Sequence, residues 1–479
     1  MSLNPLRDFF EISYGTLEEL NLQARAQRLA RVPVARIREE RMKSLADNKQ
    51  IKAITVGFTD LEGRFHLLDY DKNHLMKCSD NLPFDSSISR GFGVNEESGL
   101  RLIVDWPSFY WLPSDVFGPG RVLVFGLLEY QDHSPFPEDM RGRLKQYTDG
   151  LFSLHRLNCT TAHGIEGFLF KGQDAEIRYR DTGRFECVSS GGYDHSLPRD
   201  AVRQFIDSCA EAQRAMGFLN EKDHPEVAPS QFEMNFNYSE ANIAADQVQL
   251  YKLLARQVAA QMGLTACFLP KPLAGVNGSG MHTNLRLSKA GKNLFHDQAG
   301  KEGLSPMAWD FVQRILARAQ DLCLILNPSV NAYRRLAPHF EAPNQIKVSP
   351  TDRGSMIHIP LGNAQSARLE VRSVAPDANP YLNLYSILRT GLEGPMTELD
   401  DTRKRSRTRF LPDNIQDAIR CFKGSKFLED ALGEEVHAKY AELKLRQAER
   451  CPKALGSQVK ACEIQFHHEI TNQYLWSQF

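Results

Sequence analysis

The stretch Gln231-Phe232-Glu233-Met234-Asn235-Phe236-Asn237-Tyr238 alternates apolar and polar side chains along its whole length. Successive side chains of an extended strand point to opposite faces of a sheet. The apolar side chains therefore share one face, and Glu233, Asn235 and Asn237 share the other. This pattern predicts a strand with one face packed on the core and one polar face.

Two further segments repeat this arrangement. Arg368-Leu369-Glu370-Val371-Arg372 places three charges opposite two aliphatic side chains, and Ile165–Phe170 carries one carboxylate, Glu166, in an otherwise apolar run. Two interpretations follow. The polar face is either the solvent side of an amphipathic sheet, or the inner side of a sheet that curves around a polar, ligand-filled cavity.

Composition excludes several classes of protein. The chain has 479 residues, 42% of them hydrophobic and 24% charged, which is typical of a globular protein rather than a disordered one. The formal net charge of −1 gives no basic excess for nucleic acid or anionic lipid. No apolar run approaches the roughly 18–20 residues of a membrane helix, and the N-terminus lacks a signal-peptide pattern. Nine cysteines without a CxxC pair argue against a zinc ribbon or a disulfide scaffold, so we expect a cytoplasmic protein.

The order of patterns along the chain predicts an α+β protein. Helical spacing runs over residues 15–50, β-rich runs occupy 51–58, 64–68, 100–105 and 121–128, and a Pro-containing linker spans 132–139. Helices are expected at 141–157, 200–216, 247–263, 307–326 and over much of 413–479. We therefore predict three parts, namely a helical N-terminal extension (1–50), a small β-rich domain (51–138) and a large domain (139–479).

Two loops have compositions that suit ligand binding. Lys271–His282 contains Asn277-Gly278-Ser279-Gly280, and glycines let a backbone approach a ligand closely. The loop lacks the Gly-Lys-Ser/Thr ending of a Walker A motif. Asn327–Pro343 contains adjacent arginines, whose guanidinium groups match carboxylates and phosphates. Each feature alone could equally be an ordinary turn or a surface pair.

Together these segments resemble the glutamine synthetase family from about residue 51 to the C-terminus. The resemblance implies a small N-terminal β-grasp-like domain and a large catalytic domain with a curved antiparallel sheet surrounded by helices. It also implies a homo-oligomeric ring, a hexamer or a stacked double hexamer, whose active site lies between adjacent subunits. The motifs that carry it are Phe84–Ser87, His224–Pro229 with Gln231–Glu233, Lys271–His282, Asn327–Pro343, Arg368–Arg372 and Asn379–Leu382.

The implied activity is an ATP-dependent ligation that phosphorylates glutamate and then replaces the phosphate with ammonia. The implied ions are Mg²⁺ or Mn²⁺, which prefer oxygen ligands. By resemblance, one ion is held by Glu166, Glu226 and Glu233, and a second by His282 and Glu370.

The resemblance assigns the remaining roles residue by residue. Asp85, Tyr193, Arg353 and Glu341 match catalytic positions, with Asp85 and Tyr193 in the ammonium pocket and Glu341 on a loop that closes the site. The positions that match substrate-binding residues are Asn277, Gly278, Arg335 and Arg372. The positions that match nucleotide-binding residues are Glu221, His224 and Arg368.

Two departures from the family pattern leave the function open. Gly164 stands where a third ligand of the second ion is expected, with His163 as a candidate replacement, and His358 stands where a phosphate-binding arginine is usual. Three functions remain: a ligase that makes glutamine from glutamate and ammonia, a γ-glutamyl–amine ligase for a polyamine or monoamine, and a catalytically weak structural or regulatory homologue.

Overall fold

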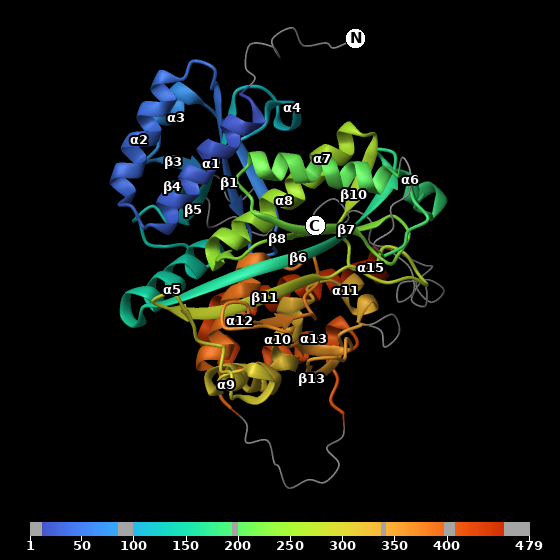
Figure 1. Ribbon diagram of the computed structural model, residues 1–479. Coiled ribbons are helices and arrows are strands. Elements are labelled where there is room, and N and C mark those ends of the chain that lie inside the picture. The colour runs from blue at the N-terminus through green and yellow to red at the C-terminus, as the bar shows by residue number, and fades with distance from the viewer. Residues whose placement is uncertain (1–11, 85–98, 194–199, 337–341, 397–407, 455–479) are drawn as a thin grey trace.

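A computed structural model describes residues 12–84, 99–193, 200–336, 342–396 and 408–454. Its first half contains a five-stranded sheet in the order β2-β1-β5-β4-β3, shown in blue to cyan in Figure 1. β1 and β5 run parallel and the other neighbours run antiparallel. The strands span Ala53–Thr59 (β1), Phe65–Asp71 (β2), Leu82–Phe84 (β3), Leu100–Trp111 (β4) and Arg121–Glu129 (β5), with the short helices α3 (Lys72–Cys78) and α4 (Ser114–Phe117) between them.

The larger sheet follows the order β13-β14-β15-β11-β6-β8-β7, with β9 and β10 pairing to β6 and β12 to β11. All its pairs are antiparallel except β13–β14. The predicted mixed class is confirmed. The strands span Leu157–Lys171 (β6), Asn220–Pro225 (β7), Gln231–Phe236 (β8), Ser239–Glu240 (β9), Leu264–Cys267 (β10), Met281–Lys289 (β11), Lys292–Asn293 (β12), Gln345–Ser349 (β13), Ser355–His358 (β14) and Leu369–Val371 (β15).

Helices surround this sheet, with α7 and α8 above it and α9, α10, α12 and α13 below it in Figure 1. The predicted helix over 307–326 is two helices, because Arg318 has a non-helical φ of −108° and ψ of 15°. The helical content predicted over much of 413–479 is formed, within the described residues, by three helices separated at Gly424–Ser425 and Gly433. The bounds are Met140–His155 (α5), Ala175–Thr182 (α6), Ala201–Ala215 (α7), Ala241–Gln261 (α8), Pro306–Ala317 (α9), Ala319–Leu326 (α10), Val330–Arg335 (α11), Pro380–Glu393 (α12), Ile415–Lys423 (α13), Lys426–Leu432 (α14) and Glu434–Ala454 (α15).

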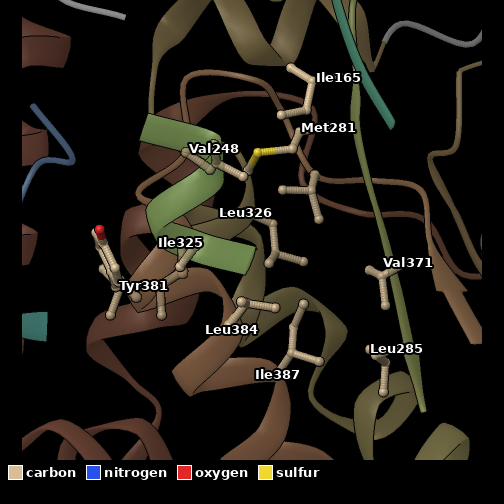
Figure 2. Close-up of a cluster of buried hydrophobic side chains, with 14 of the residues drawn as sticks. Ile165, Val248, Met281, Leu285, Ile325, Leu326, Val371, Tyr381, Leu384 and Ile387 are labelled. Atoms are coloured by element: carbon tan, nitrogen blue, oxygen red, sulfur yellow. The ribbon is translucent and has the colours of Figure 1, made fainter. Parts of the chain in front are cut away.

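The core lies on one face of the larger sheet. Alternation along β6, β11 and β15 directs Ile165, Met281, Leu285 and Val371 toward helices α8, α10 and α12 (Figure 2). Each of these side chains is at most 1% exposed. Because side chains alternate along a strand, the neighbouring polar residues must face the other side of the sheet.

The N-terminal extension consists of two helices, α1 (Tyr14–Leu29) and α2 (Val34–Asp47), separated by a turn before Pro33. Asn21 of α1 is buried and bonds to three backbone groups. Its Nδ2 donates to the carbonyls of Trp111 and Ala215, and its Oδ1 accepts from the Trp111 amide. The extension is therefore joined to β4 of the small sheet and to helix α7 beside the large one.

A buried carboxylate on α8 adds a second connection. Asp246 accepts hydrogen bonds from Arg28 of α1, from Arg141 of α5 and from the hydroxyl of Tyr381 on α12. Arg141 also donates to Asp105 of β4. None of the helices that the structure describes is long and apolar enough to span a bilayer.

Candidate functional site

A polar cavity of about 450 Å³ lies on the polar face of the larger sheet. The wall includes residues from β6, β8, β11 and β15, so the strand alternation lines a cavity rather than an outer surface. Eleven residues predicted from sequence line it: Glu166, Tyr193, Glu226, Glu233, Asn277, Gly278, His282, Arg335, Arg353, Glu370 and Arg372.

Acidic side chains gather at one end of the cavity. Glu166 and Glu233 lie directly opposite each other on β6 and β8, and Glu226 follows β7. Burial raises the pKa of Glu166 to about 8, and the charge of Glu226 adds to the rise. Burial and the charges of Glu166 and Glu226 raise the pKa of Glu233 well above its usual range. Carboxylates that destabilise one another in this way would be stabilised by a divalent cation.

His224 lies inside this acidic group. Its Nδ1 is 3.6 Å from Glu226 Oε1, and its Nε2 is 3.6 Å from Glu233 Oε2. Among the described residues, His224, Glu226 and Glu233 are a set whose potential ligand atoms all lie within 4.8 Å of one another. The donor set, mostly hard carboxylate oxygens, fits Mg²⁺ or Mn²⁺.

Arginines line another part of the wall. Arg335, at the end of α11, is 7% exposed and donates through Nη2 to the carbonyl of Arg372. Burial lowers the pKa of Arg335 to about 10, which leaves it charged at neutral pH. Within the described residues, its Nη1 and the Nε of Arg372 have no hydrogen-bond partner. Buried guanidinium donors of this kind suit a carboxylate or phosphate ligand.

The glycine loop allows this arginine to reach the cavity. A Cβ added to Gly278 would come 2.5 Å from the carbonyl oxygen of Pro270 and 3.0 Å from Cγ of Arg335. The loop backbone also binds the acidic group, since the Gly280 amide donates to Glu166 Oε2 at 2.9 Å. The loop therefore approaches both the acidic and the basic walls, as its composition predicts.

The predicted second pair, His282 and Glu370, is also in contact. His282 Nδ1 lies 3.3 Å from Glu370 Oε1, and Arg372 Nη1 lies 3.5 Å from the same oxygen. Burial lowers the pKa of His282 to about 3, and the charge of Arg372 adds to this. Burial would raise the pKa of Glu370, but the His358 hydrogen bond and the charges of His282 and Arg372 hold it at about 2.

His163 does not replace the missing ligand at Gly164. Its side chain is 1% exposed and its Nδ1 lies 3.4 Å from Thr283 Oγ1 on the core side of the sheet. Burial lowers its pKa to about 3. The alternation of β6 explains the outcome, because consecutive residues of a strand cannot share a face.

Of the residues predicted to bind nucleotide, His224 lies within the acidic group, whereas Glu221 and Arg368 do not line the cavity. Glu221 is exposed on β7, and Arg368 donates through Nε to Asn284 Oδ1 at 3.1 Å. Their nucleotide role stays a prediction. Asp85 and Glu341 lie outside the described residues.

The cavity also contains Lys222, Val227, Pro350 and Thr351, which the sequence analysis missed. Lys222 lies at a register irregularity between β7 and β8. No pattern in the sequence predicts such an irregularity, so the position of Lys222 in the cavity could not be predicted.

Known proteins match most of this chain. Residues 137–465 match the model of the glutamine synthetase catalytic domain. Glutamine synthetase of Staphylococcus aureus is 32% identical over 432 residues, which cover 86% of this chain and 95% of that protein. Its counterpart in Staphylococcus epidermidis is 31% identical over 433 residues, with the same coverage.

Solved structures agree with this match. A complex of GmaS with ADP has a TM-score of 0.75 at 26% identity and covers 88% of this chain and 99% of its own. Glutamine synthetase of Plasmodium falciparum, solved by cryo-electron microscopy, has a TM-score of 0.77 at 18% identity, over 88% of this chain and 98% of its own. At that identity the second structure supports the fold alone. The chain belongs to the glutamine synthetase family and is a ligase of that family.

Proposed function

We propose that this chain joins glutamate to ammonia with the hydrolysis of ATP to ADP and phosphate. The observation that carries the proposal is the pairing, in one cavity, of the glutamates Glu166, Glu226 and Glu233 with the arginines Arg335, Arg353 and Arg372. A carboxylate set can hold a divalent cation, and the arginines can hold anionic substrates.

The first half-reaction forms γ-glutamyl phosphate. A γ-carboxylate oxygen bonds to the terminal phosphorus of ATP as the bond to ADP breaks. Arg335 and Arg372 would bind the carboxylates of glutamate, and Arg353 the transferred phosphoryl group. Mg²⁺ or Mn²⁺, held by Glu166, Glu226 and Glu233, would neutralise phosphate oxygens when bound.

The second half-reaction forms the amide. The ammonia nitrogen bonds to the γ-carbonyl carbon, loses a proton to a base and expels phosphate. Glu226 and Tyr193 border the cavity where ammonium would bind, and the ring of Tyr193 packs edge-on against His224 at 5.1 Å. Asp85 would complete this pocket from a neighbouring subunit, and Glu341 would accept the proton.

A γ-glutamyl–amine ligase is the second candidate, and one observation favours it. Val227 follows Glu226 in the chain, lines the cavity and is 46% exposed. An apolar side chain beside the carboxylate that would bind a cationic nitrogen could contact the alkyl chain of an amine, whereas ammonium offers no such group.

The experiment that tests both candidates is phosphate release from ATP by the purified chain. Reactions would contain Mg²⁺ or Mn²⁺ and glutamate, with ammonia compared against methylamine, ethylamine and putrescine, and reactions without glutamate as the control. Glutamine formation with ammonia as the preferred nucleophile supports the first candidate. A preference for one of the amines supports the second candidate, the γ-glutamyl–amine ligase, in place of the first. No glutamate-dependent phosphate release with any nucleophile contradicts both.

A further inference from the structure

Arg335 stands at the end of a helix of six residues. This helix, α11, follows the N-cap Ser329 and ends at Arg335, which lines the cavity. A helix of this length has few backbone hydrogen bonds of its own, because the first four amides of a helix have no intrahelical acceptor. Contacts with neighbouring segments must therefore fix the direction in which Arg335 points.

The segment between β15 and α12 holds both ends of this helix. At the end of α11, Arg335 Nη2 donates to the carbonyl of Arg372 at 2.9 Å. At its start, Ser329 Oγ donates to Asp377 Oδ2 and accepts from the amide of Ala332 at 3.2 Å. The serine hydroxyl therefore caps α11 and also joins it to the segment that carries Arg372.

That segment is itself fixed to the core. The amide of Ala375 donates to the carbonyl of Leu326 on α10 at 2.9 Å. The carbonyl of Val374 accepts from the amide of Met281 on β11, also at 2.9 Å. Val374 and Ala375 are both fully buried. A contact with this segment therefore fixes the position of α11 relative to the large sheet.

Asp377 has neighbours that suit two different roles. Its side chain is buried, as is that of Ser329, and among the described residues its Oδ1 has no hydrogen-bond partner. Burial raises the pKa of Asp377, while the hydrogen bond from Ser329 and the charges of Lys252 and Lys444 oppose the rise. The two lysines suit a purely structural role, whereas the bond to Ser329 connects Asp377 to the helix that carries Arg335.

We infer that Asp377, acting through Ser329, is a positioning residue that holds Arg335 at the angle needed to bind a carboxylate of glutamate. A guanidinium group binds a carboxylate through two parallel hydrogen bonds, so its orientation decides the affinity. The inference rests on the proposed function, in which Arg335 binds glutamate. A purely structural role would lower stability without a selective effect on glutamate, whereas a positioning role weakens glutamate and spares the nucleotide.

The test measures the Kd of glutamate and the Kd of ADP by calorimetry on the purified full-length chain with Mg²⁺. Ser329→Ala deletes the hydroxyl that joins α11 to Asp377. We expect the Kd of glutamate to rise roughly fivefold, the effect of one lost N-cap, while the Kd of ADP stays unchanged. Ser329→Thr keeps a hydroxyl and should restore the wild-type value. An unchanged Kd of glutamate in Ser329→Ala, or an equal rise for both ligands, overturns the inference.

Ser425 offers a matched control. Like Ser329, it is a buried serine N-cap whose hydroxyl donates to an aspartate, here Asp321, and accepts from a backbone amide, that of Leu428. No residue of its helix, α14, lines the cavity, and the structure describes all of that helix. Ser425→Ala should therefore lower Tm as Ser329→Ala does and leave both Kd values unchanged. A rise in the Kd of glutamate in Ser425→Ala would overturn the inference, because loss of stability alone would then explain the effect.

A double-mutant cycle tests whether Asp377 acts through Ser329. Asp377→Asn keeps the size of the side chain but replaces a charge-assisted hydrogen bond with a neutral one, so we expect a smaller rise in the Kd of glutamate than in Ser329→Ala. If both residues act through one hydrogen bond, the double variant binds glutamate no more weakly than Ser329→Ala alone. Additive losses would show that Asp377 acts by a separate route, and would overturn its assignment.

The outcomes separate this inference from the proposed function. A selective loss of glutamate binding in Ser329→Ala, without glutamate-dependent phosphate release by the wild type, keeps the positioning role and removes the ligase. Phosphate release by the wild type, with the Kd of glutamate unchanged in Ser329→Ala, keeps the ligase and removes the positioning role.

Discussion

Arg335 packs closely against the glycine loop at Gly278, which has no side chain. Adding one methyl group at this position, by substitution with alanine, tests that contact. Gly278→Ala would put a Cβ 2.5 Å from a backbone oxygen of Pro270, so the loop or Arg335 must shift. We expect the KM for glutamate to rise roughly tenfold, which corresponds to about 1.4 kcal/mol. Initial-rate kinetics would measure it. Gly150→Ala, at a helical position with no atom within 4 Å, is the matched control. An unchanged KM would mean that Arg335 does not contact glutamate.

A buried lysine on α8 should make stability depend on pH. Burial lowers the pKa of Lys252 from 10.5 to about 7, and Arg256 adds to this. Between pH 7 and about 10 the unfolded chain keeps this proton and the folded chain releases it, so the free energy of unfolding should rise with pH. The slope for one such group is at most about 1.4 kcal/mol per pH unit.

The substitution Lys252→Met should remove this dependence, because it keeps the chain length and deletes the ammonium. Denaturant unfolding at pH 7, 8 and 9 would measure the slope for the wild type, for Lys252→Met and for the exposed control Lys289→Met. Equal slopes in all three proteins would show that Lys252 stays charged in the folded state.

Part of the site could be predicted one residue at a time. Strand alternation alone placed Glu166, Glu233 and Glu370 each on the polar face of its own strand, because the period of a strand is fixed by its geometry. The same rule shows why His163 could not ligate. The contact between His358 and Glu370 could not be predicted, since it depends on which strands become neighbours.

Helix α1 connects β4 of the small sheet to helix α7 through Asn21, which bonds three backbone groups in the interior. Asn21→Ala would leave an amide and two carbonyls buried without partners. We expect a loss of about 2–4 kcal/mol in the free energy of unfolding. Chemical denaturation would measure it, with Gln23→Ala on the exposed side of the same helix as the control. A loss below about 0.5 kcal/mol would show that water or a shift of α1 replaces these bonds.

The elements were predicted best where their patterns were long. The predicted helix at 200–216 and the predicted strand segment Ile165–Phe170 correspond to α7 and to the second half of β6. The breaks at Arg318 and at Gly433 were missed, because apolar spacing continues across them and only the backbone angles change. Tertiary packing fixes such angles, and a single sequence does not show it.

At the scale of the whole molecule, we propose a homo-oligomeric ring whose active site takes Asp85 from a neighbouring subunit. Co-expression of an Asp85→Ala chain with an Arg335→Ala chain tests this proposal. If two subunits share the site, about a quarter of randomly formed interfaces carry both native residues, and activity should return in proportion. Each variant expressed alone is the control. If one chain contains the whole site, the mixture stays inactive.

The order of strands in the large sheet was beyond sequence analysis. β6 has β11 on one side and β8 on the other, although β11 lies more than a hundred residues further along the chain. Local patterns give the strands and their faces, whereas long-range pairing depends on the summed packing of the whole core.

This order of strands determines when the site can first exist during synthesis. β6 leaves the ribosome early, but it pairs with β8 and with β11, and β11 in turn pairs with β15. A nascent chain therefore leaves one edge of β6 unpaired until β11 has emerged, and the cavity wall stays incomplete until Glu370 and Arg372 have emerged. Pairing over such separations is slow, and an exposed strand edge invites association with other chains. The binding of the first divalent cation, through Glu166, Glu226 and Glu233, should accordingly report the pairing of β6 with β8 and not the completion of the large sheet.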